Sequence, residues 1–276
     1  MLFTYSEWER FCKSLDEKHI HSVTSLSLIC DIPHADRFVT IKHDVESLPK
    51  KALDIARIEA HYGHQSSYYV QPSLMREANA AIFQEIQKLG HEVSYHHSVI
   101  DAARGDISVA IKLYQNDLKL FKKFGFDVRT VCQHGNPASI YDNRDFFKSS
   151  EVKEIYHDQT DIMADFKNKI GVPYTYISDF GMLFKKVNDP THDKNMSADE
   201  EYEDIGSIDK VLNTIFENPS ISYIVSAHPH RYSRFAALAR ARKILFKFLR
   251  MMAKILFIIP GIKILVFNNN KLIRYI

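Results

Sequence analysis

Apolar and polar positions recur along the chain with two different periods. Short apolar, β-branched runs predict strands, and runs with apolar residues three and four positions apart predict amphipathic helices. The predicted strands cover 37–42, 66–70, 92–96, 128–132 and 222–227, and the predicted helices cover 49–62, 78–89, 107–124 and 206–217. Strand, helix and strand following one another at intervals of about 25–30 residues indicate βαβ units and a parallel sheet.

The pattern loosens after residue 135, but no linker marks a second domain before about residue 232. The segment 189–204 is polar and acidic, which predicts an exposed loop. We therefore expect one α/β unit over residues 1–232 and a separate extension over 233–276.

Charge divides the chain at the same place. The formal net charge is only +2, yet residues 231–276 hold eleven Lys and Arg and no Asp or Glu. The first 230 residues therefore carry 25 basic and 34 acidic side chains, a net charge of −9. A mildly acidic body thus precedes a strongly basic tail.

The tail is predicted to contain a basic amphipathic helix over 234–259. Its cations are spaced 3, 4, 3 and 4 residues apart, which places them on one stripe: Arg240, Lys243, Lys247, Arg250 and Lys254. The rest of the helix surface is Leu, Ile, Phe, Met and Ala, which favours a helix lying in an anionic membrane surface. The alternative is a helix whose apolar face packs on the body or on another copy.

After this helix, Pro260-Gly261 is expected to end it, and a short hairpin is expected around 268–270. Nucleic-acid binding is not expected, because the cations accompany aliphatic bulk rather than base-stacking residues. The first residues, MLFTYSEWERF, contain no basic segment before an apolar run, which argues against a secretory signal. No stretch of about 20 residues is free of charge, so a spanning helix is not expected either.

Three cysteines, Cys12, Cys30 and Cys132, form an odd number without metal-type spacing. They suggest no disulfide framework and favour a reducing compartment. We therefore expect a cytoplasmic protein, peripheral to the inner face of the membrane.

Polar residues follow the predicted strands. Ligands of parallel α/β folds bind at the carboxyl ends of the strands, so these residues should converge. They are His43-Asp44-Val45-Glu46, Gln71, His96-His97, Gln133-His134, Ser178-Asp179 and His228-Pro229-His230. Several imidazoles and carboxylates at one rim are typical of a hydrolytic metal site.

Each of these groups also has a structural interpretation. Asp44 and Glu46 can divide metal binding and proton transfer between them, or they can cap a helix that begins at Pro49. Because side chains alternate along a strand, His96 and His97 should not both face the pocket. His228 suits general acid catalysis because the unperturbed pKa of histidine is near neutral, or it can simply end a strand. His134 can contact substrate or satisfy the backbone of a turn.

Taken together and in order, the motifs IKHDVE, SYYV, GHEVSYHH, CQHGNPASIYDNRD, YISDFG and SAHPHRY resemble the polysaccharide deacetylase (NodB-homology) superfamily. The resemblance is strongest to the deacetylase-like branch associated with bacterial surface-polysaccharide gene clusters, and it spans about Phe38 to Tyr232. It implies a distorted (β/α)7 barrel and metal-dependent removal of an acetyl group from an N-acetylated sugar. The implied cofactor is a divalent metal, with zinc preferred over cobalt or nickel.

Residue roles follow from the same resemblance. Asp44 matches the catalytic base, and His228 matches the acid that protonates the leaving amine. Glu46 and His96 match metal ligands, and the pocket-lining, substrate-binding positions are His134, Asp179 and Arg231.

Two departures from the family pattern bear on the metal. The second metal histidine of the family falls on Ile100, so the third ligand is left open between His97, Asp101 and His134. Glu46 stands where the branch usually has Asp, which lengthens that ligand by one methylene. A loosened site can lose its function. The alternative to a hydrolase is therefore a non-catalytic glycan-binding or scaffold protein that retains the barrel.

Overall fold

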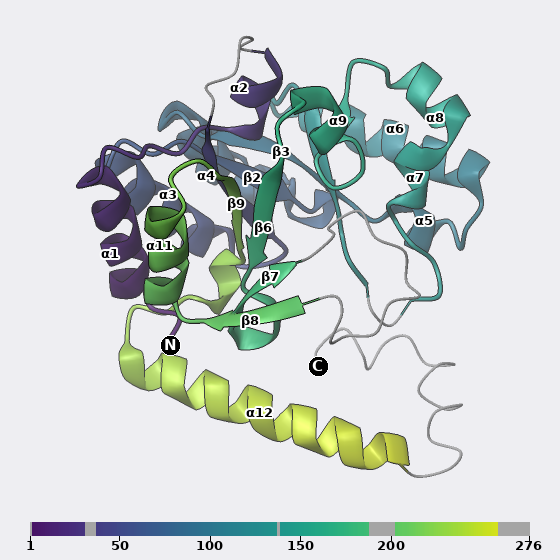
Figure 1. Cartoon of the computed structure of the whole chain (residues 1–276). Coiled ribbons are helices and arrows are strands. Elements are labelled where there is room, and N and C mark those ends of the chain that lie inside the picture. Colours follow the sequence, from purple (N-terminus) through teal and green to yellow (C-terminus); the bar gives the residue numbers. More distant parts are fainter. Residues whose placement is uncertain (1, 31–36, 137–138, 188–201, 259–276) are drawn as a thin grey trace.

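The computed structural model describes residues 2–30, 37–136, 139–187 and 202–258 (Figure 1). Nine strands form one sheet in the order β5-β4-β3-β2-β1-β9-β6-β7-β8. They are β1 (Val39–Val45), β2 (Ser66–Val70), β3 (Glu92–His97), β4 (Thr130–Gln133), β5 (Thr160–Asp161), β6 (Tyr174–Ser178), β7 (Phe184–Val187), β8 (Tyr202–Gly206) and β9 (Ser222–Ala227).

Seven of these strands pair in parallel, from β5 at one end through β1 and β9 to β6. Only β7 and β8 add antiparallel strands, beyond β6. The predicted α/β fold with seven parallel strands is confirmed. Strand order follows chain order from β1 to β5. Within the described residues no ladder joins β5 to β6, so backbone pairing does not close the barrel there.

The helices surround the sheet, and the last of them runs along one end of the body rather than over a face of the sheet (Figure 1). They are α1 (Tyr5–Asp16), α2 (Ser25–Cys30), α3 (Pro49–His61), α4 (Glu77–Lys88), α5 (Val99–Ala102), α6 (Ile107–Lys123), α7 (Asp145–Lys148), α8 (Ser150–Ile155), α9 (Phe166–Ile170), α11 (Ile208–Glu217) and α12 (Ala236–Ile258), with the short helices η1 (Pro72–Leu74), η2 (Phe180–Met182) and η3 (Pro229–Arg231). Local chemistry sets their limits. Asp106 caps α6 by accepting from the Val109 amide at 3.0 Å, and Gly125 follows α6 with a φ of +88°.

The two faces of β1 show how the sheet separates core from site. Residues of β1 are buried throughout, but successive side chains point to opposite faces. Ile41 packs with the helices of the outer core. Lys42 bonds instead to Tyr176 of β6, across the interior of the sheet. The interior is therefore polar near the carboxyl ends of the strands, where function was expected.

A buried hydrogen-bond network fixes the outer side of β1. The Glu59 carboxylate of α3 accepts from Trp8 Nε1 at 2.9 Å and from Tyr68 Oη at 2.6 Å, and it lies 2.6 Å from His43 Nε2. Helix α1, strand β2 and strand β1 thus meet at one carboxylate. Because His43 precedes Asp44, this network holds in place the strand end that carries the candidate base.

Most predicted elements are confirmed to within two or three residues, and one prediction is partly wrong. The loop expected over 189–204 ends in strand: residues 202–204 belong to β8, because they pair with β7. Residues 188–201 lie outside the described part. The tail helix is confirmed as α12, whereas the expected helix stop at Pro260-Gly261 and the hairpin around 268–270 lie outside the described residues. Among the described helices, none combines the length and apolar character needed to cross a bilayer.

Candidate metal and acid-base site

Four strand ends bring five of the predicted polar residues together. Asp44 lies in β1 and His96 in β3, and Glu46, His134 and His228 follow β1, β4 and β9. These strands are neighbours or next neighbours in the parallel sheet, so their carboxyl ends share one rim. The convergence expected from the sequence is therefore present in the structure.

Glu46, His96 and His134 form the first cluster at this rim. Their ligand atoms all lie within 4.8 Å of one another. Glu46 Oε1 is 3.3 Å from His134 Nε2 and 3.9 Å from His96 Nε2. Atoms bound about 2.0–2.2 Å from one zinc ion stand roughly 3–4 Å apart, so two imidazoles and a carboxylate here suit a divalent cation.

The hydrogen bonding of the His96 ring suits a metal ligand. Its Nδ1 is 3.0 Å from the Cys132 carbonyl oxygen, which can only accept, so Nδ1 carries the proton and Nε2 presents a lone pair. That Nε2 is buried and has no hydrogen-bond partner. Burial also lowers the pKa of His96, against the raising effect of Asp44 and Glu46, which favours the neutral, metal-binding form. An orphaned acceptor facing Glu46 and His134 is the observation that best fits a metal here.

Glu46 is held as a carboxylate. Burial alone would raise its pKa, but the neighbouring imidazoles of His134, His96 and His228 outweigh burial and place the pKa well below its usual value. The pKa of His134 is raised by the same contact, although burial opposes the change. A cation entering this cluster would therefore compete with a proton on His134.

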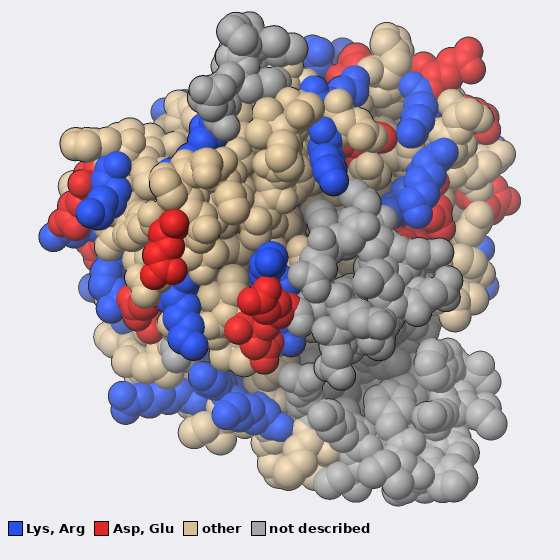
Figure 2. Space-filling model, in the orientation of Figure 1, with Lys and Arg blue, Asp and Glu red and all other residues tan. Residues whose placement is uncertain are grey.

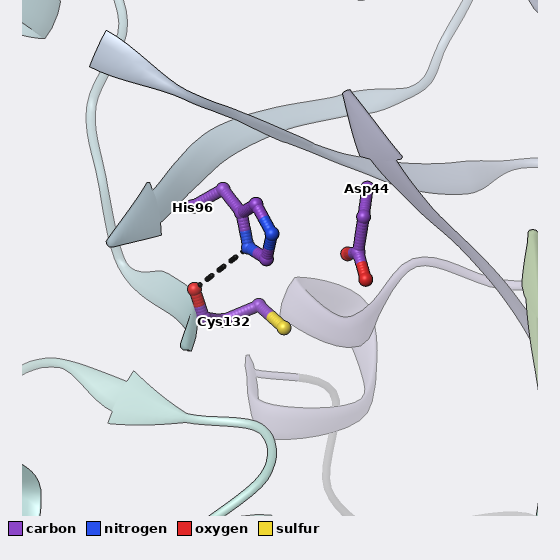
Figure 3. Close-up of side chains that lie close together, drawn as sticks. All are labelled: Asp44, His96 and Cys132. Carbon is purple, nitrogen blue, oxygen red and sulfur yellow. Dashed lines mark hydrogen bonds between the residues drawn. The ribbon is translucent and has the colours of Figure 1, made fainter. Parts of the chain in front are cut away.

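Asp44, His96 and Cys132 form a second possible cluster deeper in the sheet (Figure 3). In Figure 3 the His96 ring and the Asp44 carboxylate lie side by side with Cys132 below them, and Nδ1 of His96 is directed to the cysteine carbonyl. Burial raises the pKa of the Cys132 thiol well above its ordinary value, and a thiol that keeps its proton is a poor ligand. Asp44 is already paired with Lys42. The Glu46 cluster is therefore the better metal site.

The structure separates the three candidates for the third ligand. His97 points to the outer face, where its Nε2 lies 3.0 Å from Asp161 and its ring packs on Phe146. Asp101 accepts from Asn136 Nδ2 at 2.9 Å and is in neither cluster of the described residues. Of the three, His134 alone reaches Glu46 and His96. Ile100, at the family's second histidine position, is buried in the outer core.

His228, Asp179 and Arg231 form a hydrogen-bonded chain beside the cluster. His228 Nδ1 lies 2.6 Å from Asp179 Oδ1, and the His228 amide donates to Asp179 Oδ2 at 3.0 Å. Arg231 Nη1 donates to the Asp179 carboxylate at 2.9 Å and to its backbone carbonyl. Burial would raise the pKa of Asp179, but Arg231 and His228 hold it well below its usual value. The buried carboxylate thus fixes the His228 ring.

The free nitrogen of that ring faces both acids. His228 Nε2 lies 3.8 Å from Asp44 Oδ2 and 3.8 Å from Glu46 Oε1. The contacts of Asp179 are with His228 and Arg231, so its place in the structure is that of a support for His228. Substrate contact by His134, Asp179 and Arg231 stays a prediction.

Lys42 is a site residue to which the sequence analysis assigned no role. Its Nζ donates to Asp44 Oδ2 at 2.9 Å and to Tyr176 Oη at 3.1 Å inside the sheet. Burial alone would lower the pKa of Lys42, but the Asp44 carboxylate holds it well above its ordinary value. Burial alone would raise the pKa of Asp44, but the charge of Lys42 lowers it below its ordinary value. A lysine two residues before Asp44 on the same strand face was the available signal.

We expect Lys42→Met to destabilise the protein by roughly 3–5 kcal/mol, because it leaves the Asp44 carboxylate buried without its partner. The double variant Lys42→Met/Asp44→Asn removes both charges and should recover most of that loss. Urea denaturation of the single and double variants measures both values. Additive losses would contradict the pairing.

The helix-capping interpretation of Asp44 and Glu46 is not supported. Helix α3 begins at Pro49, and its N-cap residue Leu48 has no side-chain hydrogen bond. Asp44 lies within β1 and is bonded to Lys42. Neither acid therefore satisfies the amides of α3.

Comparison with known proteins gives structural neighbours only. No family model matches the chain, and no curated protein matches it. A CE4 esterase from Streptococcus mutans is 12% identical, with 84% of this chain and 89% of that chain covered and a TM-score of 0.45. The peptidoglycan deacetylase PdaC from Bacillus subtilis is 13% identical, with 78% and 96% covered and a TM-score of 0.37.

A third neighbour is BA3943 from Bacillus anthracis, a CE4 family pseudoenzyme. It is 12% identical to this chain, with 80% of this chain and 62% of that chain covered and a TM-score of 0.43. The names agree with the resemblance seen in the sequence. At these identities and TM-scores they assign neither an activity nor its absence.

Proposed function

We propose that this protein is a metal-dependent hydrolase that removes the acetyl group from an N-acetylated sugar of a surface polysaccharide or its precursor. The observation that carries the proposal is the Glu46, His96 and His134 cluster with an unpartnered His96 nitrogen. Asp44 and His228 stand beside it, so a base and an acid accompany the metal ligands.

The chain's own residues divide the chemistry of amide hydrolysis. A divalent cation held by Glu46, His96 and His134, with zinc preferred over cobalt or nickel, would polarise the acetyl carbonyl and favour ionisation of water. Asp44, kept ionised by Lys42, accepts the proton of the attacking water. His228 delivers a proton from Nε2 to the departing nitrogen, while Asp179 accepts from Nδ1 and keeps the ring in that orientation.

The alternative is a non-catalytic glycan-binding or scaffold protein. One observation favours it: the position of the family's second metal histidine is Ile100, which packs in the hydrophobic core and offers no ligand. The two functions share the α/β fold and differ in whether His134 completes a working metal site.

Metal loading and acetate release test the proposal together. The purified protein should bind one zinc ion per chain and release acetate from an N-acetylated chito-oligosaccharide. Chelation should abolish the release, and added zinc, cobalt or nickel should restore it. If the protein binds none of these metals, the proposed mechanism is contradicted. If it binds metal but releases acetate from no N-acetylated sugar, the result favours the non-catalytic alternative.

A further inference from the structure

Helix α12 exposes much of the apolar surface of the described chain. Seven of the thirteen large apolar side chains that are exposed lie between residues 235 and 252: Phe235, Leu238, Ile244, Leu245, Phe248, Met251 and Met252. Ile244 is 69% exposed and Phe248 is 51% exposed. Scattered exposed apolar residues are ordinary, but a continuous strip along one helix marks an interaction surface.

The apolar strip points away from the body because other residues of α12 hold the helix to it. Ala239 is buried. Arg242 donates to Ser233 Oγ at 3.1 Å and to the Tyr232 carbonyl at 3.4 Å. At 100° per residue, Ala239 stands on nearly the opposite side of the helix from Ile244 and Phe248. The body-facing side is thus occupied, and the strip remains uncovered.

Basic residues line one edge of the strip. Arg240 and Lys247 are exposed and fall between the body-facing side and the strip. Figure 2 shows basic side chains beside uncharged surface along this helix, at the lower left of the view. The sequence from 231 to 276 contains no acid that could neutralise them. The side chains of Arg250 and Lys254, the other predicted cations of the stripe, lie outside the described residues.

Contacts of α12 reach the two segments that carry His228 and its hydrogen-bond partner Asp179. Arg242 Nη1 lies 3.5 Å from the His230 carbonyl oxygen, two residues beyond His228. Phe246 and Lys243 of α12 line a small cleft with Met182 of η2, which follows Asp179. The helix is therefore anchored at the carboxyl ends of β6 and β9, the end of the sheet where the candidate site lies.

We propose that α12 lies in the surface of an anionic phospholipid membrane, with Ile244, Leu245 and Phe248 among the acyl chains. Arg240 and Lys247 then reach the lipid phosphates from the edge of the strip. Through its contacts with η2 and η3, the docked helix holds the candidate site next to the bilayer. A second copy is a poorer occupant, because pairing two such helices brings their basic edges together without an acid on either helix.

Vesicle co-sedimentation of the full chain tests this proposal without any substrate. Wild type should bind vesicles of phosphatidylcholine with 30% phosphatidylglycerol much more tightly than pure phosphatidylcholine, and salt should weaken the binding. Arg240→Gln/Lys247→Gln should weaken binding to the anionic vesicles by about 30-fold, since each cation near the surface contributes about 1 kcal/mol. Ile244→Asn/Phe248→Asn should also release the protein.

The matched control is Lys112→Gln/Lys119→Gln on α6, which removes two exposed cations at the same seven-residue spacing and should bind like wild type. The proposal is overturned if the α12 and α6 charge variants bind anionic vesicles with equal affinity. It is also overturned if the wild-type protein does not bind anionic vesicles. A dimer that forms without lipid and dissociates on Ile244→Asn/Phe248→Asn also overturns it. Because acetate release is not measured, these outcomes are independent of the proposed hydrolase activity.

Discussion

Replacing His134 by alanine is expected to lower zinc affinity by roughly 100-fold or more and to abolish acetate release. Losing even an outer-shell partner of a ligand costs about 10–100-fold in metal affinity, so losing a direct ligand should cost at least the upper value. The reason lies in the cluster: His134 Nε2 is the imidazole nearest to Glu46, at 3.3 Å, and Ile100 supplies no substitute. Zinc titration against a competing chelator measures the change.

His157→Ala is the matched control, since His157 is exposed and bonds only weakly to the local backbone, with Nδ1 3.3 Å from the Glu154 carbonyl. It should leave both affinity and activity unchanged. His97→Gln should instead lower stability without lowering zinc affinity in the folded fraction, because His97 pairs with Asp161 on the outer face. Undiminished zinc affinity in His134→Ala would contradict the assignment of this ligand.

Asp179→Asn is expected to lower kcat for amide hydrolysis by about 10²–10⁴-fold while zinc binding is retained. The Asp179 carboxylate accepts from His228 Nδ1, so Nε2 can pass a proton to the leaving nitrogen and recover it later. An asparagine amide can donate to Nδ1 and leave the ring in the wrong tautomer. Steady-state kinetics on an N-acetylated chito-oligosaccharide measure the loss.

An aryl acetate separates this positioning role from a general structural one. Its phenolate leaves without protonation, so Asp179→Asn should hydrolyse it with a loss of less than about tenfold. Asp145→Asn, which alters an exposed aspartate beside Lys148, serves as the matched control and should resemble wild type on both substrates. Equal losses on the amide and the aryl ester would show that Asp179 does not act through His228.

Local chemistry made most elements predictable from the sequence. Asp106 and Gly125 mark the two ends of helix α6 in the sequence. Strand β2 was predicted with its observed bounds, Ser66–Val70. Helix α1 was missed, although Thr4 accepts from the Glu7 amide at 3.2 Å in the spacing of a capping box. Strands β7 and β8 were missed because they are short and half-exposed, so their apolar pattern is weak.

The sequence by itself determined which polar residues follow the strands and, through strand alternation, that His96 and His97 face opposite sides. Only the tertiary structure decided that His134 completes the cluster, that Asp179 supports His228 and that Lys42 also bonds to Tyr176 of β6. The physical reason is that element type depends on neighbours within a few residues. The approach of an imidazole after β4 to a carboxylate after β1 depends on strand order, register and twist, which no local pattern records.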